Sequence, residues 1–223
     1  MSILFVLLMF VVVMTFNYFY FRRPGVQPEL DTTLWAAPKP PSMKREFGFE
    51  IPQGYSFHPG HTWVLKEGPD RARVGIDSFA GSLVGKVDHV DVIGLNRWVR
   101  QGQKLMTLTA GGKRYELLSP VEGVITAVNS DVTKDPALVN QDPYKDGWIA
   151  MVKSPDLSIN QKNLVQGPMV APWMQNNVTR LNSMLSQASP AMAQDGGLPV
   201  NGLLGKLSPE LEDKITKEFL LLS

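Results

Sequence analysis

Few side chains in this chain of 223 residues have the chemistry and spacing of a reactive site. The chain has no cysteine and three histidines, so thiolate nucleophiles, disulfides and cysteine-ligated metals are excluded. His58 and His61 stand three residues apart, a spacing that metal ligands can use. The proline and glycine between them favour a turn, and no third ligand is evident. We therefore expect no metal site.

Catalytic groups are equally scarce. His89 lies in the alternating run 87–92, where we interpret it as an exposed strand residue among aspartates rather than a catalytic base. The sequence contains neither a phosphate-binding glycine loop followed by lysine and a hydroxyl residue nor a nucleophile elbow. We therefore expect no catalytic residue and no enzyme activity.

The overall charge excludes a further class of function. The chain has 22 basic and 21 acidic residues, which gives a net charge of +1. Such a balance supplies no strong field to attract a polyanion. We expect no nucleic-acid partner.

The N-terminus predicts a membrane anchor in residues 1–23. Residues 2–21 contain no charged side chain, and about 20 apolar residues match a hydrocarbon core of roughly 30 Å. A cleaved signal peptide is disfavoured because the basic leading segment is missing and aromatic residues occupy positions 18–21. Arg22 and Arg23 follow at once, so the positive-inside rule predicts a single-pass protein with its soluble domain in the cytoplasm. Residues 2–21 would contact membrane lipid.

Composition divides the rest of the chain into three parts. Residues 24–53 are proline-rich and predict a semi-extended linker. Residues 54–156 show short alternating apolar runs between turn residues, which predicts a mainly β domain. Residues 157–223 form a helical C-terminal extension with two amphipathic stripes. We expect those stripes, within residues 172–222, either to pack on their own domain or each other, or to dock on other protein subunits or on the membrane surface.

Several segments of the β region, in order along the chain, resemble motifs of the H protein of the glycine cleavage system. They are His61-Thr62-Trp63-Val64, Val74-Gly75-Ile76, Leu83-Val84-Gly85, Leu118-Ser119-Pro120-Val121-Glu122-Gly123, and Leu138-Val139-Asn140-Gln141-Asp142-Pro143-Tyr144-Lys145-Asp146-Gly147-Trp148. The resemblance covers residues 54–156. It implies a flattened, lipoyl-domain-like barrel of two antiparallel sheets, here with an N-terminal transmembrane helix and C-terminal amphipathic helices added.

A predicted hairpin lies where this family carries its cofactor. Two alternating runs flank Gly111-Gly112, a dipeptide that accepts the positive φ angles of a two-residue turn. The resemblance implies that the family attaches a lipoyl group to a lysine at this tip. Without gaps, that position falls on Gly112, which cannot be lipoylated, and Lys113 lies one residue further on. A shift of one residue turns a strand side chain to the opposite face.

Two interpretations of Lys113 therefore remain open. In the first, Lys113 is a solvated residue, no cofactor is bound, and the protein is a membrane-anchored accessory or structural subunit of a membrane-associated assembly. In the second, the turn re-aims Lys113 for lipoylation, and the protein is a lipoyl carrier for glycine cleavage or a related redox system. The sequence favours the first, because both the lysine and the glutamate that precedes it in the family are missing.

Overall fold

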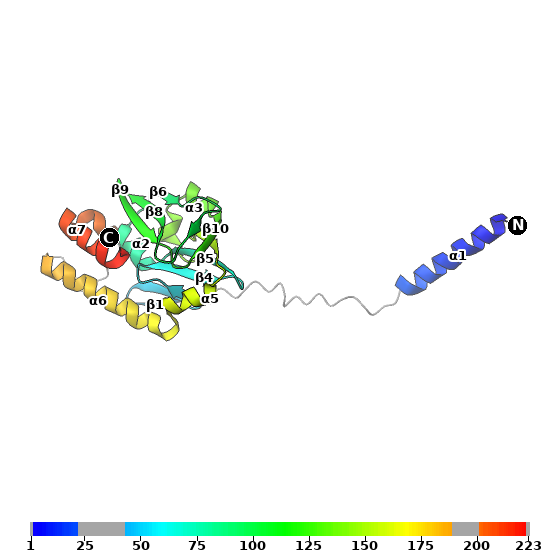
Figure 1. Ribbon diagram of the computed structural model, residues 1–223, viewed down its shortest axis with the longest axis horizontal. Helices are drawn as coiled ribbons and strands as arrows, with labels where there is room; N and C mark the ends of the chain where they lie inside the picture. Colours follow the sequence, from blue (N-terminus) through cyan, green and yellow to red (C-terminus); the bar gives the residue numbers. More distant parts are fainter. Residues whose placement is uncertain (1, 22–42, 189–200, 222–223) are drawn as a thin grey trace. The chain divides into compact units, whose positions relative to one another are not determined.

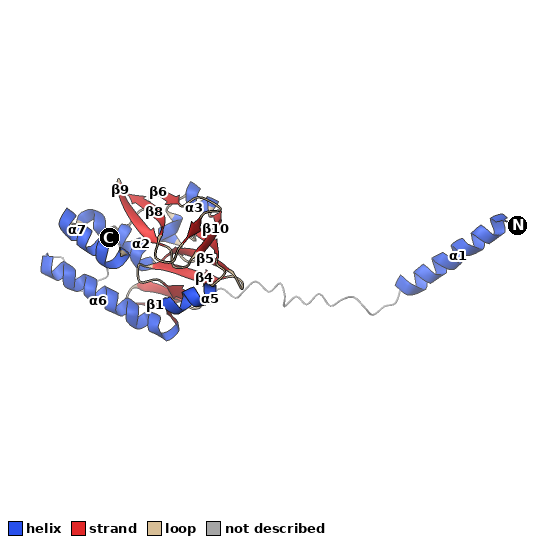
Figure 2. Cartoon of the chain, viewed as in Figure 1, coloured by secondary structure: helices blue, strands red, loops and turns tan. Residues whose placement is uncertain are grey.

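The computed structural model describes residues 2–21, 43–188 and 201–221 (Figure 1). The chain divides into two units, Met1–Pro40 and Pro41–Ser223. Helices and strands of the second unit are distinguished in Figure 2, which shows strands at its centre and helices around them.

The described part of the first unit, residues 2–21, is the helix α1 (Ser2–Phe21), which has no acidic residue in its first turn and no basic residue in its last. Its apolar side chains between Phe5 and Phe16 are 54–67% exposed. A hydrocarbon core calls for about 20 apolar residues in one helix. Within the described parts of the chain, no helix is both long and apolar enough to cross a membrane, so the predicted transmembrane span is not supported.

The second unit contains all twelve strands found among the described residues. They are β1 (Met43–Glu46), β2 (Phe49–Pro52), β3 (Tyr55–Phe57), β4 (Thr62–Lys66), β5 (Arg71–Ile76), β6 (His89–Val92), β7 (Trp98–Val99), β8 (Lys104–Ala110), β9 (Lys113–Leu118), β10 (Gly123–Val128), β11 (Ala150–Lys153) and β12 (Val165–Gln166). They form a seven-stranded sheet in the order β12-β3-β4-β5-β11-β10-β7, a three-stranded sheet β6-β8-β9, and the pair β1-β2. Every described pair is antiparallel. The predicted mainly β fold of antiparallel sheets is confirmed.

Helices follow or cover these strands. They are α2 (Ser78–Val84), α3 (Ser130–Lys134), α4 (Leu138–Gln141), α5 (Leu157–Asn160), α6 (Val170–Ala188) and α7 (Pro209–Leu220), with short 3-10 turns at Gln161–Asn163, Gly167–Met169 and Leu204–Lys206. The sequence of residues 78–84 favours a short helix capped by Asp77 or Ser78. The structure has this helix as α2, and Asp77 caps it by accepting a hydrogen bond from the Ala80 backbone N–H at 2.8 Å.

One close approach fixes the pairing of β4 with β5. Trp63 lies opposite Gly75, and a Cβ atom at position 75 would come within 2.6 Å of the indole ring. The indole N–H donates to the carbonyl oxygens of Ile76 at 2.7 Å and Pro143 at 3.1 Å. Glycine is therefore required at position 75, since a larger residue would displace a fully buried tryptophan.

Part of the predicted linker is structured. Residues 43–52 form the β1-β2 hairpin, and Phe49 within it is buried against Phe79 at a ring-centroid distance of 5.3 Å. The alternation in this hairpin spans only four residues per strand and includes several charged side chains. An alternating pattern of four residues is too short to predict a strand within a proline-rich segment. The remaining residues of the predicted linker up to residue 42 lie outside the described residues.

The C-terminal helices pack on their own domain. Leu181 and Leu185 of α6 and Ile215 and Phe219 of α7 are buried in the main hydrophobic core. Figure 1 shows α6 and α7 beside each other at one side of the strands, and α7 also packs against β9. Of the two interpretations of the apolar stripes, packing on the domain itself is therefore realised, and only the outer faces of these helices stay available to other proteins.

Candidate functional site

The β8-β9 hairpin has the predicted two-residue turn. Ala110 pairs with Lys113, and the two residues between them, Gly111 and Gly112, have φ angles of 56° and 78°. The Gly111 backbone N–H donates to the Asp88 carboxylate at 2.9 Å. A Cβ atom on either glycine would meet no atom within 4 Å, so the tip projects into open space as predicted.

Lys113 lies at the base of this tip. Its side chain shares a strand face with Tyr115 and Leu117, both buried, because strand residues two apart point the same way. The ammonium group forms an ion pair with Glu212 of α7. The Lys113 side chain is 43% exposed and that of Glu212 is 12% exposed. Lys113 is therefore directed toward α7 and not outward from the hairpin tip.

Glu212 joins the hairpin to the C-terminal helix at two points. Besides its ion pair with Lys113, it accepts a hydrogen bond of 2.8 Å from the Tyr115 hydroxyl. Burial, together with this carboxylate, raises the pKa of the Tyr115 hydroxyl. The tyrosine therefore stays protonated and remains a donor to Glu212. In the sequence, Glu212 is one of the acidic residues in the first turn of α7, a common position for a carboxylate, and nothing in the neighbouring residues indicates its partners.

A second polar cluster lies in the core beneath α6 and α7. His61 Nδ1 and Asp77 Oδ2 are 2.7 Å apart, and both side chains are fully buried. The His61 ring stacks on Phe79 at 4.3 Å and on Trp173 of α6 at 4.8 Å, while Phe219 of α7 lies 6.2 Å away. A pair enclosed on these sides is a packing element, since no substrate reaches it.

The predicted turn from His58 to His61 is confirmed. His58 Nδ1 accepts a hydrogen bond from the Gly60 backbone N–H at 3.0 Å, and the His61 backbone N–H donates to the His58 carbonyl at 2.9 Å. Burial, with a smaller contribution from His61, lowers the pKa of His58 to about 4. No group of three or more potential metal ligands occurs among the described side chains.

His89 occupies the exposed position predicted for it. Its side chain is 57% exposed and its Nε2 lies 3.1 Å from the Asp91 carboxylate. The neighbouring strand β8 presents Thr109 opposite it. These surroundings offer His89 no enclosed reaction site.

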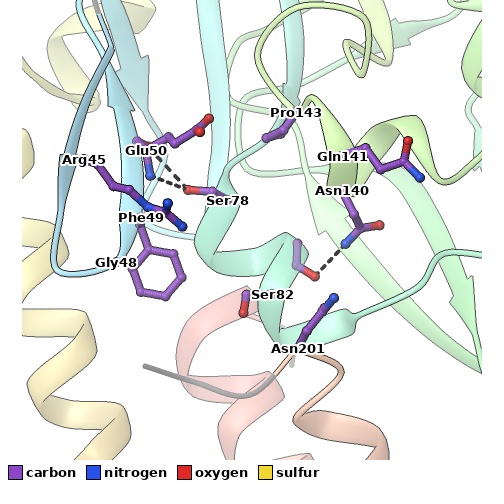
Figure 3. Close-up of a pocket in the computed structure, with 11 residues that line it drawn as sticks. Arg45, Gly48, Phe49, Glu50, Ser78, Ser82, Asn140, Gln141, Pro143 and Asn201 are labelled. Carbon is purple, nitrogen blue, oxygen red and sulfur yellow. Dashed lines mark hydrogen bonds between the residues drawn. The ribbon is translucent and has the colours of Figure 1, made fainter. Parts of the chain in front are cut away.

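A pocket of about 280 Å³ opens between the β1-β2 hairpin, α2 and α4 (Figure 3). Two of its side chains hydrogen-bond within the protein: Ser78 Oγ accepts from the Glu50 backbone N–H at 3.2 Å, and Asn140 Nδ2 donates to the Gly81 carbonyl at 2.6 Å. The Asn140 Oδ1 atom is buried and has no hydrogen-bond partner among the described residues. Arg45 and Asn201 also line it. Sequence reasoning missed this pocket because one wall comes from the hairpin assigned to the linker.

Comparison with known proteins points to one family. A family model described as "Glycine cleavage H-protein" matches residues 55–177. The chain is 36% identical over 107 residues to the glycine cleavage system H protein of Mycobacterium avium, and the match covers 48% of this chain and 81% of that protein. It is 35% identical over 108 residues to the H protein of Thermus thermophilus, with coverages of 48% and 84%. A crystal structure of an H protein from Mycobacterium marinum is similar at 25% identity and a TM-score of 0.48, covering 57% of this chain and 98% of that chain.

Proposed function

Because this chain belongs to the glycine cleavage H-protein family, we propose that it is a non-catalytic, H-protein-like subunit whose hairpin carries no lipoyl group. The main support for this proposal is the position and the ion pair of Lys113. The family's lipoyl position falls on Gly112, and the adjacent Lys113 holds its ammonium against Glu212. A swinging cofactor arm needs a free amine on a projecting base, and this hairpin offers a glycine there.

The C-terminal extension supports the same proposal. Phe219 and Leu220 anchor α7 in the core at 2% and 0% exposure. Since these residues belong to the helix that carries Glu212, the carboxylate is held beside the hairpin by packing and not by the ion pair alone. A ligase that approached Lys113 would have to displace this helix or work beside it.

A lipoyl carrier that uses Lys113 is the second candidate. It is favoured by the intact hairpin and by the 43% exposure of the Lys113 side chain. In that case lipoate would be the cofactor and the partners would be the enzymes of glycine cleavage or a related redox system.

Mass analysis separates the two candidates. We expect the intact mass of the full chain, purified from its native cell and again after incubation with a lipoate ligase and lipoate, to show no lipoyl group. The variant Lys113→Arg controls for modification elsewhere. The variant Gly112→Lys restores a lysine at the family position, and its modification would show that the ligase recognises the fold. A lipoyl mass on Lys113 in the native protein would establish the carrier function instead.

The finer part of the proposal concerns location and partners. We propose that α1 attaches the protein to a membrane, supported by the uncharged run of residues 2–21 and the exposed apolar side chains from Phe5 to Phe16. The domain that follows would lie in the cytoplasm as an accessory or structural subunit of a protein assembly. Attachment is tested by fractionation: we expect the full chain in the membrane pellet after alkaline carbonate extraction, and a chain lacking residues 2–21 in the supernatant.

A further inference from the structure

The pocket between the β1-β2 hairpin, α2 and α4 contains two opposite charges that do not pair with each other. Arg45 of β1 and Glu50 of β2 both line it. They lie directly opposite each other in the hairpin register, so their side chains share one face. Figure 3 shows both side chains extending from the hairpin toward Ser78. Neither charge forms an ion pair with any residue that the structure describes.

Opposite charges elsewhere on neighbouring strands do pair. Lys104 of β8 forms an ion pair with Glu116 of β9, although the two residues are offset in the register. Arg45 and Glu50 stay apart in a more direct placement, which normally favours attraction across a hairpin. The guanidinium donors and the carboxylate acceptors of this pair are therefore unused within the described structure.

Unpaired arginines are not rare in this protein. Arg71 and Arg97 also lack an ion pair among the described residues. Neither of them lines this pocket. Arg45 differs from them because an unpaired carboxylate of opposite charge lines the same pocket.

The backbone holds the two charges in place. Phe47 and Gly48 form the two-residue turn with φ angles of 52° and 84°, and positive values at both positions are typical of tight hairpins. The Glu50 backbone N–H donates to Ser78 Oγ at 3.2 Å, and its carbonyl accepts from the Tyr144 hydroxyl at 2.9 Å. Because the hairpin is fixed to the domain before a ligand arrives, little ordering is needed on binding.

The charges of the pocket define the class of ligand. Among its lining residues, Arg45 is the one cation and Glu50 the one anion. A simple anion would be attracted by Arg45 but repelled by Glu50, and a simple cation would meet the reverse. A molecule that carries both charges satisfies both side chains.

The size and the remaining wall of the pocket restrict the ligand further. The volume of about 280 Å³ lies just below the roughly 300–1,000 Å³ of sites for drug-sized molecules, so the ligand is smaller than these. Gln141 and Asn201 contribute amide groups to the wall. A large apolar group placed against these amides would cost free energy, because it would remove them from water without a hydrogen bond.

From these observations we propose that the pocket binds a small zwitterion, namely an α-amino acid with a small or polar side chain. Its carboxylate contacts the Arg45 guanidinium and its ammonium contacts the Glu50 carboxylate. None of the residues that line the pocket belongs to the β8-β9 hairpin. The proposal is therefore independent of whether Lys113 carries a lipoyl group.

Calorimetric titration of the full chain in mild detergent tests this proposal. Each of the common α-amino acids is titrated separately at neutral pH, followed by acetate and methylamine. We expect saturable binding of at least one amino acid with a small or polar side chain. Acetate and methylamine should bind at least tenfold more weakly, because each of them matches only one of the two charges.

Two variants assign the binding to the two charges. Arg45→Gln and Glu50→Gln should each weaken binding about tenfold or more with an unchanged melting temperature, because neither charge contacts the described protein. Lys44→Gln is the matched control, since Lys44 is the exposed neighbour of Arg45 on β1, lines a different pocket and should not affect binding.

Three results would overturn the proposal. They are the absence of saturable binding by every amino acid, equally tight binding of acetate or methylamine, and binding that is insensitive to loss of either charge. The first two are read on the unaltered chain, so they stay decisive even if a variant is unstable.

Discussion

The C-terminal extension meets the β domain at two places that differ in chemistry. At the His61 cluster it contributes Trp173 and Phe219, whose aromatic rings lie against the fully buried His61, which is hydrogen-bonded to Asp77. At the hairpin it contributes Glu212 to the half-exposed Lys113. Burial of apolar surface supplies most of the free energy of docking, whereas partly exposed ion pairs add little.

The difference separates two roles. The His61 cluster determines whether the extension stays bound, and the hairpin contact determines what the bound extension does to Lys113. A change at the first place should alter the free energy of unfolding by several kcal/mol. A change at the second should alter the accessibility of one amine and leave the fold intact.

The largest effect is expected for Asp77→Ala, which removes the partner of His61 and the N-cap of α2. We expect a loss of about 4–6 kcal/mol in the free energy of unfolding, because breaking a buried pair costs about 3–5 kcal/mol and losing a cap costs about 1 kcal/mol. Urea denaturation measures it. Asp91→Ala removes the exposed contacts of Asp91 with His89 and Arg114 and should cost less than about 1 kcal/mol. Equal losses for both variants would show that burial of the His61 pair does not matter.

Phe219→Ala tests whether aromatic packing holds α7. The side chain is 2% exposed and lies against Phe79 at 5.3 Å, so we expect a loss of about 3–4 kcal/mol. Hydrogen exchange should become faster in α7 and in β9 together. The neighbouring Leu221, 43% exposed, provides the control, because Leu221→Ala should change stability by roughly 0.5 kcal/mol or less. Faster exchange in α7 with no change in β9 would contradict the coupling.

His58 makes the stability of the cluster depend on pH. Its pKa is lowered from 6.5 to about 4 in the folded protein, so between these values the unfolded chain binds more protons than the folded one. Stability is therefore complete above about pH 6.5 and falls as the pH drops toward 4, by up to about 3 kcal/mol. Denaturation curves from pH 4 to pH 7 measure this. His58→Gln should reduce the slope, and an unchanged slope would assign the dependence to other groups.

The smallest change in stability is expected for Glu212→Gln. Loss of one partly exposed ion pair should cost about 1 kcal/mol or less. The reactivity of Lys113 toward an amine-acetylating reagent should nevertheless rise several-fold, as measured by peptide mass spectrometry. Lys104, paired with Glu116 on the same hairpin, should react at the same rate in both proteins. Unchanged reactivity of Lys113 would show that Glu212 does not protect it.

Much of the β domain could be predicted from the sequence because its signals are local. The Gly111-Gly112 turn, the helix capped by Asp77 and the exposed position of His89 follow from neighbouring residues and match the structure. The contacts of Lys113 could not be predicted, since Glu212 is 99 residues away in the sequence. A glutamate in the first turn of a helix is explained by the helix dipole alone.

The β1-β2 hairpin and the pairing of His61 with Asp77 were missed for a different reason. Each strand of the hairpin is four residues long, too short for an alternating pattern to be recognised. An aspartate at position 77 is expected as the N-cap of the helix that follows it. The sequence therefore gave no reason to expect that Asp77 also contacts His61. Both features depend on tertiary packing, which the local pattern does not encode.

The separation of Lys113 and Glu212 also sets an order of events during synthesis. Translation adds roughly 5–20 residues per second, and 99 residues separate the two, so Lys113 leaves the ribosome about 5–20 s before the helix that pairs with it. During that interval the hairpin is without its C-terminal partner. An enzyme acting on nascent chains would find Lys113 open, whereas the same enzyme added to the finished protein would find it paired.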